Sequence, residues 1–119
     1  MNNSVRKDLY LLIVVLFDES YLDEILLGIA SISGGKIITV DAVSGAEKIS
    51  QSVPMFAELF GLGGKRLCKI LFSAVTVENP ASRLIDILEE AGLDFTGLSI
   101  GEIYTIKLSE AVVIEEIDI

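Results

Sequence analysis

The fold is decided by residues 9–45, LYLLIVVLFDESYLDEILLGIASISGGKIITVDAVSG, which hold an apolar run, a helix-like segment and a run rich in β-branched residues. The first nine residues are all apolar and are too few to span a bilayer, so they predict a strand buried on both faces. Ser20 stands three residues before Asp23, which is the spacing of a capping box and predicts a helix start.

The helix predicted after Ser20 has one apolar stripe, because its apolar residues recur at helical spacing. The stripe consists of Leu22, Ile25, Leu26, Ile29 and Ile32, and the pair Gly34-Gly35 ends the helix. Residues 36–43 are rich in β-branched side chains and predict a second strand that ends at Gly45.

The same order repeats in the second half of the chain. Residues 67–77 predict a strand, and Asn79 and Pro80 are suited to the cap and the first position of a helix that ends at Gly92. The apolar stripe of this second helix consists of Leu84, Ile85 and Leu88. Residues 103–108 predict a further strand and residues 111–114 a short last one. The order β-α-β-β-α-β predicts an α+β, ferredoxin-like fold with two helices on one face of an antiparallel sheet.

Length and composition predict one domain over residues 1–119, with a polar tail at residues 1–8 and an acidic tail at residues 115–119. The chain is 51% hydrophobic with a mean hydropathy of +0.61, so the free face of the sheet is expected to meet another subunit. No signal-peptide cleavage pattern follows the first apolar run, which predicts a cytoplasmic protein without membrane insertion.

The charge of the chain excludes several classes of function. The net charge is -9 without histidine, which predicts no nucleic-acid partner, no catalytic triad and no histidine-bound metal. Cys68 is alone and is expected to be a buried thiol. Glu110, Glu115, Glu116 and Asp118 lack the spacing of a cation-binding loop and favour a solvated tail, so no metal or catalytic residue is predicted.

Residues 46–65 form a segment between predicted strands that is far longer than an ordinary hairpin loop, which is typical of a functional loop. Its apolar residues Met55, Phe56, Leu59 and Phe60 could bind a partner protein. Folding of the segment over the sheet as a lid, or packing at a subunit contact, would bury the same side chains, and these alternatives stay open.

The pattern resembles the PII nitrogen-regulatory proteins and their PII-like relatives over most of the chain, from Leu9 to Ile114. The resemblance rests on the strand and helix order, on residues 37–45 leading into the long loop, and on Gly101-Glu102-Ile103-Tyr104 entering the last main strand. It implies a homotrimer with small-ligand clefts between subunits and an adenine nucleotide as the cofactor. It also implies that the 46–65 loop engages a partner such as a transporter or an enzyme.

The ligand-binding residues implied by this resemblance are Thr39, Gly45 and Gly101, with Glu102 where the family has a phosphate-contacting lysine. Lys65 and Arg66 supply positive charge at the loop exit, or simply solubilise it. Carboxylates at Glu102 and Glu115 would repel a triphosphate. The open alternatives are a nucleotide with fewer phosphates, a nucleoside-like molecule or a cation.

These observations predict a non-enzymatic, PII-like regulatory protein that binds a small ligand between subunits. The alternative is a trimeric metal-linked or structural protein similar to the divalent-cation tolerance proteins. A small ferredoxin-like enzyme is a third hypothesis, because carboxylates, Lys or Tyr can also transfer protons.

Overall fold

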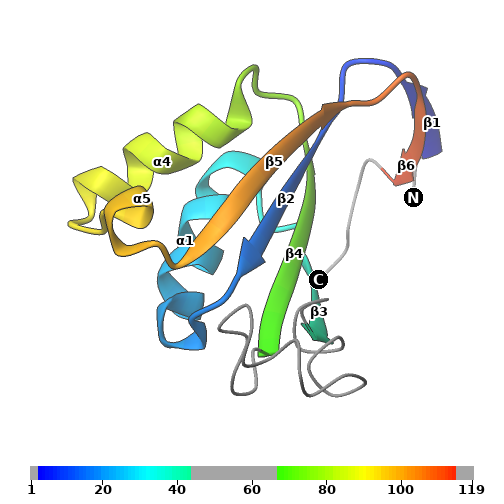
Figure 1. Ribbon diagram of the computed structural model, residues 1–119. Helices are drawn as coiled ribbons and strands as arrows, with labels where there is room; N and C mark the ends of the chain where they lie inside the picture. The colour runs from blue at the N-terminus through cyan, green and yellow to red at the C-terminus, as the bar shows by residue number, and fades with distance from the viewer. Residues whose placement is uncertain (1–2, 44–66, 115–119) are drawn as a thin grey trace.

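We describe the protein from a computed structural model, which defines residues 3–43 and 67–114. Helices α1, α4 and α5 lie on one side of the main sheet, and a two-stranded ribbon stands apart from them (Figure 1). The elements are β1 (Asn3–Arg6), β2 (Tyr10–Leu16), η1 (Glu19–Tyr21), α1 (Leu22–Ser33), β3 (Ile38–Val43), β4 (Leu67–Val75), α4 (Pro80–Glu90), α5 (Phe95–Leu98), β5 (Gly101–Lys107) and β6 (Ala111–Ile114).

The main sheet has four strands in the order β3-β4-β2-β5, and every neighbouring pair is antiparallel. Strands β1 and β6 form a second antiparallel sheet of their own. The α+β class is therefore confirmed. The order of strands and helices around the main sheet, β2-α1-β3-β4-α4-β5, is compatible with a ferredoxin-like fold.

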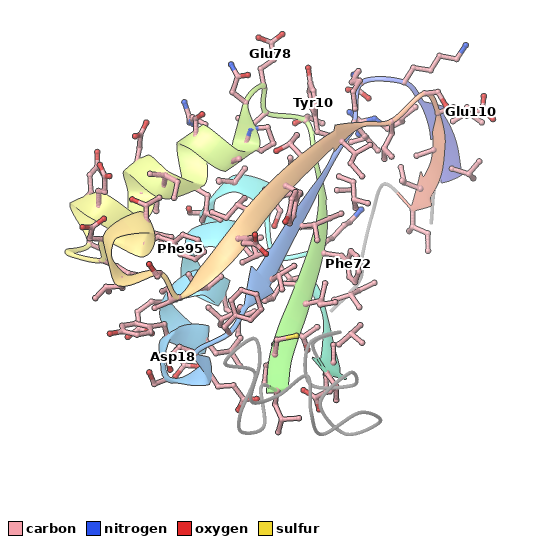
Figure 2. All side chains as sticks on the ribbon, viewed as in Figure 1. Tyr10, Asp18, Phe72, Glu78, Phe95 and Glu110 are labelled. Atoms are coloured by element: carbon pink, nitrogen blue, oxygen red, sulfur yellow. The ribbon has the colours of Figure 1, made fainter. Side chains whose placement is uncertain are left out.

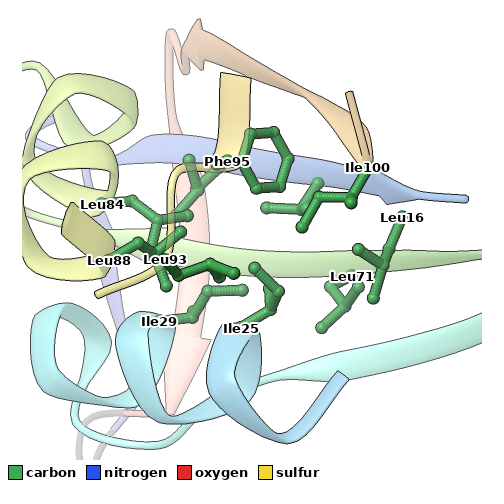
Figure 3. Close-up of a cluster of buried hydrophobic side chains, with 11 residues drawn as sticks. Leu16, Ile25, Ile29, Leu71, Leu84, Leu88, Leu93, Phe95 and Ile100 are labelled. Atoms are coloured by element: carbon green, nitrogen blue, oxygen red, sulfur yellow. The ribbon is translucent and has the colours of Figure 1, made fainter. Parts of the chain in front are cut away.

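The hydrophobic core lies between the sheet and the helices (Figure 3). Strand β2 alternates along its length, so that Leu12, Val14 and Leu16 are fully buried while the intervening side chains are not. Ile25 and Ile29 from α1 and Leu84 and Leu88 from α4 meet them from the helix layer. The helical stripes predicted from sequence therefore do face the sheet.

The two long helices approach most closely at Gly28. A Cβ built on this residue would lie 2.8 Å from Leu84 Cδ1 and 3.3 Å from Leu88 Cδ2. The missing side chain at Gly28 lets α4 pack directly against the backbone of α1.

The helix ends correct two details of the sequence analysis. Asp18 caps the 3₁₀ turn η1 that precedes α1, and its Oδ1 accepts hydrogen bonds from the backbone N–H and the hydroxyl of Ser20. Helix α1 itself begins after Tyr21, which makes no side-chain cap. The capping box expected at Ser20 was therefore wrong. Asn79 precedes α4 as expected, but it has a φ of 52° and makes no side-chain cap. At the other end of α1, Gly34 takes a φ of 74°, as its position predicts.

The ribbon of β1 and β6 continues the β2 and β5 pair. Tyr10 pairs with Lys107 and Arg6 pairs with Ala111, so three residues on each strand separate the two ladders and the register is kept. Residues 3–6, in the stretch predicted to be a polar tail, therefore form a strand. No helix among the described residues is long and apolar enough to cross a membrane.

Candidate functional site

The side of the main sheet that faces away from the helices carries an apolar surface, which we call the open face. The register places side chains from all four strands on it. In Figure 2, Phe72 projects to this side of β4, whereas Phe95 lies on the helix side. The open face consists of Leu11, Ile13, Val15, Ile38, Val40, Ile70, Phe72, Tyr104 and Ile106.

The margins of the open face are strongly exposed. Ile38 is 66% exposed, and Tyr104 and Ile106 are each 49% exposed. A hollow of about 530 Å³, lined by Leu11, Phe72 and Ile38 among others, lies where β3 begins. An apolar surface that spans a whole sheet is typical of an interaction site, because water contact with it is unfavourable.

Glu102 introduces a negative charge at the margin of the open face. Its negative charge raises the pKa of the Tyr104 phenol, to which desolvation and a hydrogen bond between the two side chains add. The two residues alternate with Ile103, so both lie on the open-face side of β5. A ligand or subunit that covers this margin would therefore contact a carboxylate and a neutral phenol.

The predicted ligand residues lie at opposite edges of the sheet. Thr39 is exposed on β3, and Gly101 and Glu102 begin β5, so three strand spacings of about 4.8 Å separate the two edges. One chain does not bring them together. A second chain is needed to do so. Gly45, Lys65, Arg66 and the predicted partner-binding residues Met55, Phe56, Leu59 and Phe60 lie outside the described residues.

One end of the sheet nevertheless gathers several of the predicted features. The register places Gly101, Leu16, Lys69 and Asp41 in one row across the four strands. Val43 and Leu67, between which the 44–66 segment runs, lie at the same end. Val43 and Leu67 therefore lie two residues beyond the row that contains Gly101, on the β3 and β4 side of the sheet.

Gly101 has a packing reason to be glycine. A Cβ at this position would lie 2.3 Å from the Val15 carbonyl oxygen and 3.1 Å from Phe95 Cζ. The absence of a side chain lets β5 start directly against β2 beneath the Phe95 ring. Sequence reasoning assigned Gly101 to a ligand and did not foresee this contact.

Lys69 is held by an ion pair at the same end of the sheet. Its Nζ lies 2.5 Å from Asp41 Oδ1 on the neighbouring strand. The hydrogen bond to Asp41 raises the pKa of Lys69, and the negative charges of Asp41 and Glu19 act in the same direction. Lys69 shares its face with Leu67 and Leu71, as the alternation predicts.

A groove of about 460 Å³ lies on the other side of β5, between this strand and α4 and α5. It is lined by Ala81, Ser82, Ile85, Asp86, Phe95, Thr96, Gly101, Glu102 and Ile103. The lining combines apolar residues with the acidic residues Asp86 and Glu102 and holds no basic residue; the side chain of Glu102 itself points to the open-face side of β5.

The short helix α5, which forms one wall of the groove, was missed in the sequence analysis. Asp94 Oδ1 accepts a hydrogen bond from the backbone N–H of Gly97 at 3.0 Å, and this cap defines the helix. The sequence signal for this helix was an aspartate three residues before a glycine, and this pattern is also common in loops.

The described residues give no support to a metal site or a reactive cysteine. Among residues 3–43 and 67–114, no three His, Cys, Asp or Glu side chains are grouped so that they could hold one metal ion. The tail acids Glu115, Glu116 and Asp118 lie outside these ranges. Cys68 is a free, buried thiol, as expected.

Comparison with known proteins adds no assignment. Neither a model of a protein family nor a curated protein matches this chain.

Proposed function

We propose that the protein is a non-enzymatic, PII-like regulator that assembles into a trimer through the open face. The observation that carries this proposal is the apolar open face, which the helices leave uncovered. Assembly through this face would remove the exposed side chains of Ile38, Val40, Tyr104 and Ile106 from water.

We propose further that a small ligand binds in the clefts between subunits. Thr39 and Gly101 lie on opposite edges of one sheet, so a second subunit is needed to place them on either side of one ligand. Glu102 disfavours a triphosphate, and the ligand that fits best is one with little negative charge, such as a nucleoside or a nucleotide with few phosphates.

In this proposal, the 46–65 loop is the part of the protein that acts on the partner. The nearest described residues on either side of it, Val43 and Leu67, lie at the sheet end where β5 begins. A ligand bound there would contact the base of the loop. It would control a partner protein if its affinity differed between two arrangements of the loop.

The assembly is tested by light scattering on variants of the open face. Val40→Lys and Ile106→Lys place charge on side chains that are already 44% and 49% exposed in one chain, so each variant is expected to fold. The matched control is Leu27→Lys on α1, at 73% exposure and away from the open face. We expect trimers for the wild type and the control, and monomers for the combined open-face variant. A monomeric wild type would overturn the proposal.

The ligand is tested by thermal shift with adenosine, AMP, ADP, ATP, magnesium and calcium. A ligand at one hundred times its dissociation constant adds about 2.7 kcal/mol of stability. We expect a shift with adenosine or AMP in the wild type, and a gain toward ATP in Glu102→Lys. No shift with any nucleoside or nucleotide in either protein would exclude this ligand class.

A further inference from the structure

Strand β5 forms an edge of the main sheet whose backbone is available for pairing. The backbone N–H of Phe17 donates to Ile100 O at 2.8 Å, and that of Leu108 donates to Leu9 O at 3.0 Å. Hydrogen-bonded pairs recur at every second residue of an antiparallel ladder, so Glu102, Tyr104 and Ile106 bond to β2. The backbone groups of Gly101, Ile103, Thr105 and Lys107 therefore point outward, and no strand in residues 3–43 or 67–114 pairs with them.

This edge has few of the features that protect sheet edges from pairing. Such edges usually contain a proline, a bulge or a charge in their middle. The centre of β5, residues 103–106, is IYTI, without charge, proline or bulge. The other edge strand, β3, carries Asp41 within its six residues. This composition is typical of a strand whose edge is paired with another strand in the functional protein, so we expect the edge of β5 to be covered.

The groove beside β5 would receive the side chains of an added strand. A strand paired with β5 lies about 4.8 Å from it, and its alternate side chains point to the helix side. There they would meet Ala81 and Ile85 of α4, which pack against the core together with Ile103. The remaining side chains would lie next to Tyr104 and Glu102 on the opposite side.

The geometry points to β5 and the α4 groove as a docking site for an extended segment of a partner protein with alternating apolar and basic side chains. Backbone pairing supplies affinity and the groove supplies selectivity, as in other cases of strand addition. Asp86 lies on the groove side of this edge and the Glu102 side chain on its open-face side, so acidic residues flank an added strand on both sides and favour basic side chains. This inference does not rest on the proposed function, because the groove lies within one chain.

A partner with basic side chains is favoured over a second copy of this chain. Two β5 edges paired with each other would bring a second set of Asp86 and Glu102 to the same contact. The β3 edge of a second copy, residues 38–43, offers Asp41 and no basic residue. Lys69 already balances the charge of Asp41, so the β3 edge of a second copy supplies no free positive charge to complement Asp86 and Glu102.

The probe for this site is a ten-residue synthetic peptide of alternating valine and lysine, and the control is the same peptide with glutamate in place of lysine. Both are titrated into the isotopically labelled full chain, and backbone amide shifts and hydrogen exchange are followed by NMR. We expect the lysine peptide to bind at least tenfold more tightly. It should slow exchange of the outward amides of Ile103 and Thr105, while amides on the β3 edge stay unchanged.

Two substitutions test the pairing and the charge separately. Thr105→Pro removes an outward N–H that β2 does not use, so the sheet should persist while peptide binding falls at least tenfold. Thr105→Val keeps the N–H and should bind like the wild type. Glu102→Lys changes the charge on the side to which the lysines point when the valines enter the groove, and it should reduce the preference for lysine over glutamate at least threefold.

Three results would overturn the inference. They are equal binding of both peptides, unchanged affinity in a folded Thr105→Pro variant, and protection of the Ile103 and Thr105 amides that rises with protein concentration in the absence of peptide. The last result would mean that a second copy occupies the edge. A monomeric wild type that still binds the lysine peptide would leave this inference standing and reject only the proposed assembly.

Discussion

Replacing Gly101 with alanine should destabilise the protein by about 2–3 kcal/mol. The new Cβ would lie 2.3 Å from the Val15 carbonyl oxygen, a distance that real Cβ contacts do not show, so β5 must move away from β2 by at least about 0.7 Å. Overpacking costs about 1–3 kcal/mol, and weakening of a backbone hydrogen bond costs about 0.5–1.5 kcal/mol. Reduced chain entropy of the unfolded state offsets about 0.4–1 kcal/mol of this.

The assay is urea unfolding followed by circular dichroism, in which this loss lowers the midpoint by roughly 1–2 M. Phe95→Leu in the same background should recover a minor part of the loss, because it relieves the 3.1 Å contact but not the clash with Val15. A Gly101→Ala variant with wild-type stability that fails to respond to ligand would refute the packing argument. It would show instead that the glycine is needed for a ligand.

Three further predictions concern stability. Ser99→Gly should raise the free energy of unfolding by up to about 1 kcal/mol, because Ser99 has a φ of 54°, and calorimetry would show the rise in Tm. Leu84→Ala should cost about 2–5 kcal/mol alone, and Gly28→Ala should be better tolerated in that background, with a coupling of at least about 0.5 kcal/mol in a double-mutant cycle. The hydrogen bonds from Ser20 lower the pKa of Asp18, so their contribution is present above the unfolded pKa of about 4 and is lost as pH falls through the folded pKa. Ser20→Ala should therefore weaken the fall in stability below pH 4 in acid unfolding experiments, and an unchanged slope would contradict the assignment.

The elements with strong periodicity were predictable from the sequence. The run at residues 9–17 and the stripes beginning at Leu22 and Leu84 correspond to β2, α1 and α4, because burial against one layer imposes a regular spacing on apolar residues. Gly34 and Gly92 end the helices, with positive φ angles that glycine adopts at little cost.

The predicted helix cap was wrong because neighbouring side chains can compete for the same hydrogen bonds. Asp18 rather than Ser20 accepts the hydrogen bonds before α1, since both are good capping residues and sequence spacing alone does not choose between them. Strand β1 lies in a polar stretch without alternation and forms by pairing with β6, one hundred and more residues away. Such long-range pairing leaves no local signal.

The only indication of the candidate site in the sequence was its excess of apolar residues. Composition indicated an uncovered sheet face, and the register assigns it to particular side chains of the open face. The groove beside β5 could not be foreseen, because it arises where α4, α5 and an edge strand meet. The placement of Thr39 and Gly101 on opposite edges likewise follows from strand order, which the sequence does not display.

The matched bends between the main sheet and the ribbon have a genetic consequence. Residues 7–9 and 108–110 are equal in number, and this equality keeps Val5 and Val112 opposite each other beyond the bend. Deleting one residue from only one of the two connections would shift the pairing and turn the following side chains of that strand to the other side of the ribbon. Insertions and deletions in these two connections should therefore be tolerated in pairs and rejected singly, although the connections lie about a hundred positions apart in the gene.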